Sequence, residues 1–173
     1  NDDWTKDSNE NSTTSDNDGK FTIKYANGNL VSIGGTDLDS QTLLDNLLIT
    51  HKLTGHSEFK AVTPVTSVAA FMADAANVNA ALGIDPDIDI YTFDPVANKG
   101  DGGVNDYLYV LGIRLTVFAL SLQNAINEIE STTDTTEDYF KALAEELEKE
   151  YTLTSSKVDI TNTNFIWAVM DNI

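Results

Sequence analysis

The hydrophobic pattern separates a strand-like first third of the chain from a helical remainder. Apolar and polar residues alternate over Phe21–Tyr25, which predicts a half-buried strand. Asn27-Gly28 is a strong hairpin signal, so we expect 30–33 to return antiparallel to that strand. A third strand is favoured over 47–53, where the apolar residues also suit a short helix, and 59–62 is expected to be extended.

Helical periodicity begins at a Thr-Pro junction. Thr63 can cap the first turn with its hydroxyl, and Pro64 suits the first helical position, where a missing N–H costs nothing. Spacing and flanking glycines then predict helices over about 64–74, 76–82, 104–130 and 136–151, and a last one that starts at Asn162 or Thr163. Asp94-Pro95 predicts a further helical turn that ends at Gly100.

Two of these helices differ in how their apolar residues are distributed. The first half of 104–130 is apolar on nearly every side, which predicts the central helix of a bundle. Helix 136–151 has a one-sided apolar stripe, formed by Phe140, Leu143, Leu147 and Tyr151. Its glutamates are expected to face water; they are Glu145, Glu146, Glu148 and Glu150.

The fold class that follows is α+β, with a small antiparallel β-segment (about 20–62) followed by a mostly helical bundle (about 63–173). Residues 1–18 are almost entirely polar or charged, so they are expected to form an acidic tail or a cation-binding loop. The chain has 173 residues, of which 41% are hydrophobic, and this is enough for one core. The β-segment and the bundle are therefore expected to form one folding unit.

Charge and cysteine content narrow the classes of partner. The formal net charge is −18, from 28 acidic and 10 basic residues, so nucleic acid and anionic lipid surfaces should repel the chain. There is no cysteine, which excludes disulfides, zinc–thiolate sites and cysteine nucleophiles. The longest apolar run, 107–122, contains Arg114 and is shorter than a bilayer-spanning helix, so no membrane insertion is expected.

Two acidic clusters are candidates for a calcium site, because calcium prefers oxygen ligands. Asp16 and Asp18 lie in the sequence DNDG, and Asp2 could join them from upstream. The twelve-residue EF-hand pattern is not met, and an ordinary turn before a strand is the alternative. Asp87 and Asp89, in the sequence DPDID, form the second cluster, for which solvated loop carboxylates are the alternative.

No set of residues indicates catalysis. His51 and His56 would lie on opposite faces of a strand, so a metal pair is not expected. Neither a nucleophile elbow nor a phosphate-binding glycine loop occurs. Arg114, the one arginine, is expected to form a structural ion pair with a carboxylate. The sequence thus predicts no catalytic residues and leaves ligand-binding residues unknown.

An ordered set of short motifs, DGKF, GGTD, VTPVTSVAAFM, NAALGI and YTFDP, carries a family resemblance. It resembles a module of very large bacterial surface adhesins of the repeats-in-toxin type, which often carry tandem immunoglobulin-like and cadherin-like domains. The match covers about Asp16–Pro95. The matching residues are Asp16, Asp18, Gly19, Phe21, Gly34, Gly35, Asp37, Thr63, Pro64, Thr66, Ala81, Leu82, Gly83, Phe93, Asp94 and Pro95.

The resemblance implies an extracellular, non-catalytic structural or spacer module, in which calcium would act as a stiffener. Its partners would be neighbouring domains of the same polypeptide, and the chain is expected to be a segment of a longer protein. Three alternatives remain open: a domain that binds a cell-surface glycan or peptide, a self-assembling filament subunit, and a secreted hydrolase with a carboxylate pair.

Overall fold

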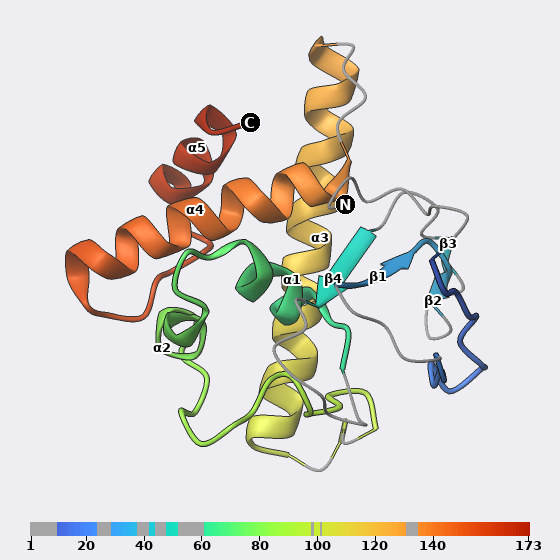
Figure 1. Cartoon of the computed structure of the whole chain (residues 1–173). Coiled ribbons are helices and arrows are strands. Elements are labelled where there is room, and N and C mark those ends of the chain that lie inside the picture. The colour runs from blue at the N-terminus through green and yellow to red at the C-terminus, as the bar shows by residue number, and fades with distance from the viewer. Residues whose placement is uncertain are drawn as a thin grey trace.

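The computed structural model shows a mostly helical molecule (Figure 1). It describes residues 10–23, 29–37, 42–43, 48–51, 61–97, 99–100, 102–130 and 135–173. The helices are α1 (Pro64–Phe71), the 3-10 helix η1 (Ala75–Asn77), α2 (Val78–Leu82), α3 (Val104–Glu130), α4 (Thr136–Thr154) and α5 (Thr163–Asp171). The predicted helical part of the fold is therefore confirmed.

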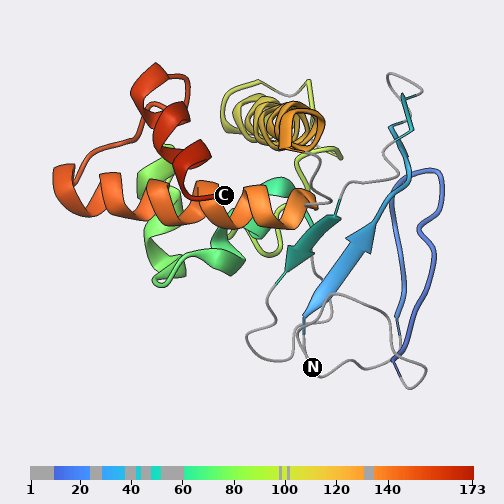
Figure 2. The same ribbon diagram turned by 90° about the horizontal axis from the view of Figure 1, so that it is seen from above.

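The strands form two short antiparallel ladders beside the helices (Figure 2). They are β1 (Leu30–Ile33), β2 (Thr36–Asp37), β3 (Thr42–Leu43) and β4 (Leu48–His51). β1 pairs with β4, with Leu30 opposite His51, and β2 pairs with β3, with Thr36 opposite Leu43. β2 and β3 lie between β1 and β4 in the chain, so the two ladders are nested. Gly34 and Gly35, both at positive φ (65° and 121°), separate β1 from β2.

The predicted hairpin around Asn27-Gly28 is wrong in its pairing. β1 pairs with β4, and residues 21–23 form no strand, while 24–28 lie outside the described residues. The turn signal was strong, but the pairing of β1 is decided by a segment about 20 residues further along, which local spacing does not report. The third strand is confirmed over Leu48–His51, and the helical alternative there is wrong.

Helix ends follow the capping residues that the sequence offers. Thr63 and Thr66 form a reciprocal capping box: the Thr66 N–H donates to Thr63 Oγ1 (3.2 Å), and the Thr63 N–H donates to Thr66 Oγ1 (2.9 Å). Gly83 ends α2 in the left-handed conformation, at φ 69°. Asn162 caps α5 through its side chain. Asp94 and Pro95 start a turn rather than a helix.

The central helix of the bundle is α4, which corrects the prediction for α3. α4 contacts α1, α2, α3 and α5, and it has buried side chains on several of its sides. These side chains are Thr136, Tyr139, Phe140, Ala142, Leu143, Ala144, Glu146 and Leu147. Among the described elements, α3 packs against α1 and α4, and it leaves Val110, Ile113 and Val117 exposed. An all-round apolar sequence does not specify which side faces the core, and packing against α1 and α4 selected one.

Candidate functional site

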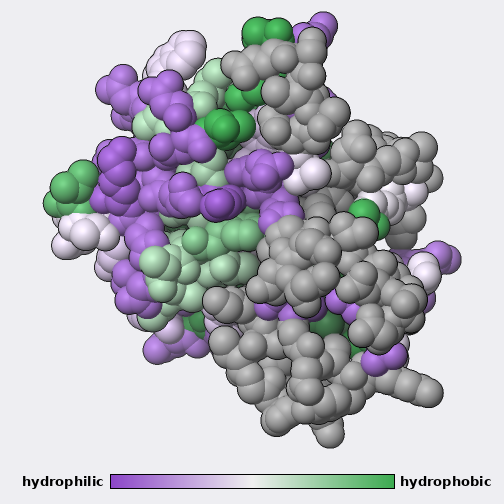
Figure 3. Space-filling model, turned by 45° about the horizontal axis from the view of Figure 1, so that its top comes forward, coloured by the Kyte–Doolittle hydropathy of each residue, from purple (hydrophilic) through white to green (hydrophobic). Residues whose placement is uncertain are grey.

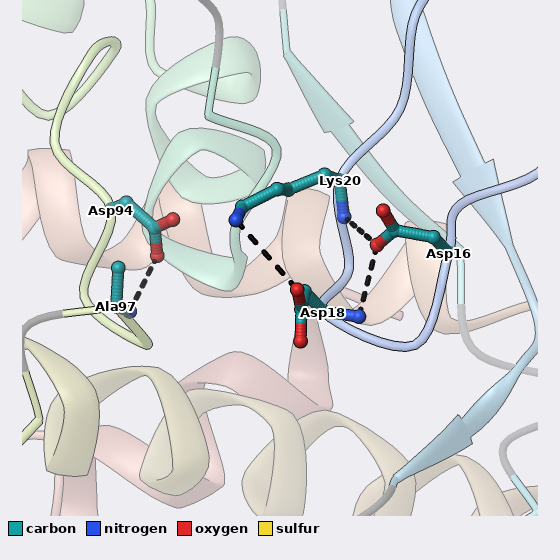
Figure 4. Close-up of polar contacts among 5 residues, drawn as sticks. All are labelled: Asp16, Asp18, Lys20, Asp94 and Ala97. Carbon is teal, nitrogen blue, oxygen red and sulfur yellow. Dashed lines mark hydrogen bonds and ion pairs between the residues drawn. The ribbon is translucent and has the colours of Figure 1, made fainter.

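The first acidic cluster forms a tight turn. Asp16 Oδ1 accepts hydrogen bonds from the backbone N–H groups of Asp18 and Lys20, both at 2.9 Å (Figure 4). Lys20 Nζ lies 3.7 Å from Asp18 Oδ2, and Gly19 has φ 74°. Residues 16–20 are all exposed to solvent. The geometry is that of an Asx turn, in which the carboxylate stabilises its own loop.

The second acidic segment, between α2 and α3, repeats this arrangement. Asp85 Oδ1 accepts from the Asp87 N–H (2.9 Å), and Asp89 Oδ1 accepts from the Tyr91 N–H (3.0 Å). Asp94 Oδ1 accepts from the Val96 N–H at 3.0 Å. It also accepts from the Ala97 N–H at 2.9 Å (Figure 4). Burial raises the pKa of the Tyr91 phenol, and the nearby Asp89 charge raises it further.

The described residues do not complete a calcium site. In 10–23, 61–97 and the other described ranges, no group of three or more His, Cys, Asp or Glu side chains could hold a metal ion. Asp16 and Asp18 belong to one turn. Asp87 and Asp89 lie in a loop whose aspartates accept hydrogen bonds from its own backbone. Asp2 lies outside the described residues. Calcium takes six to eight oxygen ligands, which these pairs do not supply.

A carboxylate on α4 joins two elements that are far apart in sequence. Glu148 accepts hydrogen bonds from the N–H groups of Ala73 (to Oε2, 2.7 Å) and Asp74 (to Oε1, 2.9 Å). Asp74 in turn caps η1, because its Oδ1 accepts from the Ala76 N–H at 3.1 Å. The sequence predicted Glu148 to face water. The charge-assisted bonds instead fasten the α1–η1 loop to the central helix.

Glu146 was also predicted to face water, but it is buried at 2% exposure. Its carboxylate accepts hydrogen bonds from Lys149 Nζ (2.8 Å) and from Asn172 Nδ2 (3.4 Å), so it links α4 to the end of α5. The hydrogen bond with Glu146, followed by the charge of Glu146, raises the pKa of the Lys149 amine. A buried carboxylate needs such partners, which explains why Lys149 lies one turn away.

Another cluster lies at the end of α2. Tyr107 of α3 donates its hydroxyl hydrogen bond to the Leu82 carbonyl oxygen, and Lys157 Nζ donates to the Tyr107 hydroxyl at 3.0 Å. The Lys157 amine also lies 5.0 Å from the centre of the Tyr107 ring. The Lys157 stem covers Gly83, where a Cβ atom would lie 2.4 Å from Lys157 Cδ. This cluster fastens α2, α3 and the α4–α5 loop together.

The remaining predicted residues lie apart from these clusters. Arg114, which was expected to form an ion pair, is exposed on α3. His51 lies in β4, and His56 lies outside the described residues. Asp159 caps its own turn, and hydrogen bonds from Thr161 hold the pKa of its carboxyl below the usual value.

Hydrophilic residues form a band across the face that α4 crosses (Figure 3). α3 differs from this surface. Within the described residues it is one helix that is long and apolar enough to cross a membrane, over Val104–Ile129, with a mean hydropathy of 1.4. Its apolar stretch is thus longer than the run on which the sequence expectation rested. The core helix of a soluble bundle meets the same two criteria, so length and composition alone do not assign a membrane role.

Comparisons with protein-family models, with curated proteins and with solved structures found no match.

Proposed function

We propose that the chain is a non-catalytic structural module of a large bacterial surface adhesin, which holds neighbouring domains of the same polypeptide outside the cell. The observation that supports this is the use of the motif residues. Thr63 caps α1, Gly83 ends α2, and Asp16 and Asp94 each accept two backbone hydrogen bonds in their own loops. These residues hold backbone rather than present groups to a ligand.

A spacer must keep its shape under load, and the polar cross-links suit this task. Glu148 and Tyr107 connect segments separated by 75 and 25 positions in the chain. Glu148 fastens the α1–η1 loop to α4, and Tyr107 fastens the end of α2 to α3, so neither segment can shift without breaking hydrogen bonds. The net charge of −18 favours solubility at the high local concentration of a cell surface.

Surface exposure on intact cells is the direct test. An antibody raised against the folded chain should label cells of the source bacterium without permeabilisation, and brief external proteolysis should release its peptides. A cytoplasmic protein, treated in parallel, should stay unlabelled until the cells are lysed. Labelling of the chain only after lysis would refute the extracellular module.

Binding arrays test the structural role separately. The isolated chain is expected to give no hits on glycan and peptide arrays and no turnover of glycan or peptide substrates. Specific hits would replace the spacer role by that of a ligand-binding adhesin domain, and turnover would replace it by that of a secreted hydrolase.

A further inference from the structure

The last helix is held to the bundle by little apolar surface. α5 lies beside α4 in both views (Figure 1 and Figure 2), and it contacts that helix. Its buried side chains are Phe165 and Val169, whereas Trp167 is 59% exposed. A helix of nine residues is also marginal in water by itself. The polar contacts between α4 and the end of α5 therefore matter for keeping α5 in place.

Those contacts bring an amine, a carboxylate and an amide together. Glu146 Oε2 accepts a hydrogen bond from Lys149 Nζ at 2.8 Å and another from Asn172 Nδ2 at 3.4 Å. Lys149 Nζ also donates to Glu146 Oε1 at 3.1 Å. The Glu146 side chain is 2% exposed, and that of Lys149 is 61% exposed. The lysine amine and the asparagine amide thus meet on one oxygen atom of a buried carboxylate, and water reaches the amine.

We propose that this cluster forms a covalent amide bond between the side chains of Lys149 and Asn172, with Glu146 as the catalytic residue. An amine can attack the carbon of a carboxamide, and the attack is favoured when the fold holds the two groups together and a neighbouring carboxylate moves their protons. Glu146 contacts both reacting groups. Bond formation needs only the folded chain, so the proposal is independent of where the protein resides.

The reaction balances within the three side chains. Glu146 Oε2 takes a proton from the Lys149 ammonium group, and the neutral Nζ attacks Cγ of Asn172. A bond forms between Nζ and Cγ, and the bond between Cγ and Nδ2 breaks. The two protons that Nζ loses leave on the former Nδ2 as an ammonium ion, the first of them by way of Glu146. Glu146 ends as a carboxylate, which can accept a hydrogen bond from the N–H of the new amide.

The charge of Lys149 sets the pace of this reaction. The hydrogen bond with Glu146, and then the charge of Glu146, raise the pKa of the Lys149 amine, so the amine is cationic at neutral pH. It can attack only after it has given a proton to the carboxylate. The bond should therefore form slowly, and only after folding has brought α5 onto α4.

Mass spectrometry of the whole chain tests the proposal. During incubation of the folded protein at neutral pH, the intact mass should fall by one molecule of ammonia. A protease digest should then contain one joined peptide that carries both Lys149 and Asn172. Lys149→Arg and Asn172→Ala should each keep the full mass. Lys141→Arg changes another exposed lysine of α4, so it is the matched control and should lose ammonia as wild type does.

Glu146→Gln tests the role of the carboxylate, because the amide keeps a hydrogen-bond acceptor but cannot carry the proton. Loss of ammonia should slow by about a hundredfold or more, as is typical when a general acid–base group is removed. Circular dichroism should show that each variant keeps its helices. The joined chain should also have a higher Tm than Lys149→Arg, because a cross-link between the two positions restricts the unfolded state as a disulfide does.

Three results would overturn the proposal. The first is an intact mass that stays constant, with no joined peptide in the digest. The second is a loss of ammonia that persists in Lys149→Arg, which would show that an asparagine cyclises onto its own backbone. The third is an unchanged rate in Glu146→Gln, which would remove the carboxylate from the reaction.

Discussion

Removing the carboxylate of Glu148 is expected to loosen the α1–η1 loop from α4. Glu148→Ala deletes both acceptors at once, because each oxygen of the carboxylate accepts one backbone N–H, from Ala73 (2.7 Å) and Asp74 (2.9 Å). The helix itself should tolerate the change, since alanine is the best helix former. The loss therefore reports on the contact between the two segments.

The magnitude follows from the kind of hydrogen bond. A hydrogen bond to a charged group contributes about 1.5–3 kcal/mol when buried, and this site is partly exposed, so water can replace part of each bond. Two bonds discounted in this way give a loss of about 1–2 kcal/mol in the free energy of unfolding. For a domain of this length, that corresponds to a fall in Tm of roughly 2–8 °C.

Thermal and urea unfolding of wild type, Glu148→Ala, Glu148→Gln and Glu145→Ala measure the effect. Glu148→Gln should fall between wild type and Glu148→Ala, because its amide keeps one oxygen and turns a donor towards the second N–H. Glu145→Ala changes an exposed glutamate of the same helix and should alter stability by less than about 0.5 kcal/mol. Equal Tm values for Glu148→Ala and Glu145→Ala would refute the cross-link.

Three further substitutions probe the caps and turns. Gly83→Ala should destabilise more than Gly103→Ala in urea unfolding: both have positive φ, which costs about 1–2 kcal/mol, but the new Cβ at Gly83 also displaces Lys157. Equal losses would show that the lysine moves freely. Asp159→Asn should lower Tm near neutral pH, because hydrogen bonds to the Asp159 carboxylate lower its pKa in the folded state. Protonation removes this contribution, so the difference in Tm between wild type and variant should shrink as pH falls below about 3.8. A difference in Tm that does not depend on pH would contradict this. Asp16→Asn keeps the turn acceptor without the charge, so its Tm should match that of wild type with calcium and with chelator; loss of a calcium-dependent rise in Tm would reveal a cation ligand.

The features that sequence predicted well depend on contacts within one helical turn. The capping box at Thr63, the left-handed end at Gly83 and the side-chain cap at Asn162 each join residues that are close in sequence. Such signals specify where a helix begins or ends without knowledge of the tertiary fold. α3 also has the predicted bounds, Val104–Glu130.

The features that sequence missed depend on contacts between distant segments. Glu145, Glu146 and Glu148 lie in the same short run of glutamates. Glu146 is nevertheless buried beneath α5, and Glu148 binds a loop some 75 positions away in the chain. β1 likewise pairs with β4, a strand that is distant from it in the sequence. Helical spacing carries no information about which backbone N–H groups of another segment lie opposite a side chain.

The exchange of roles between α3 and α4 is reflected in the size and placement of their apolar residues. α4 alternates small and large buried residues, with Ala142 and Ala144 beside Leu143, so several helices can approach it closely. α3 buries one row and has apolar residues left over on the opposite side. Folding of a single copy does not require Val110, Ile113 and Val117 to be apolar, since they are exposed in it.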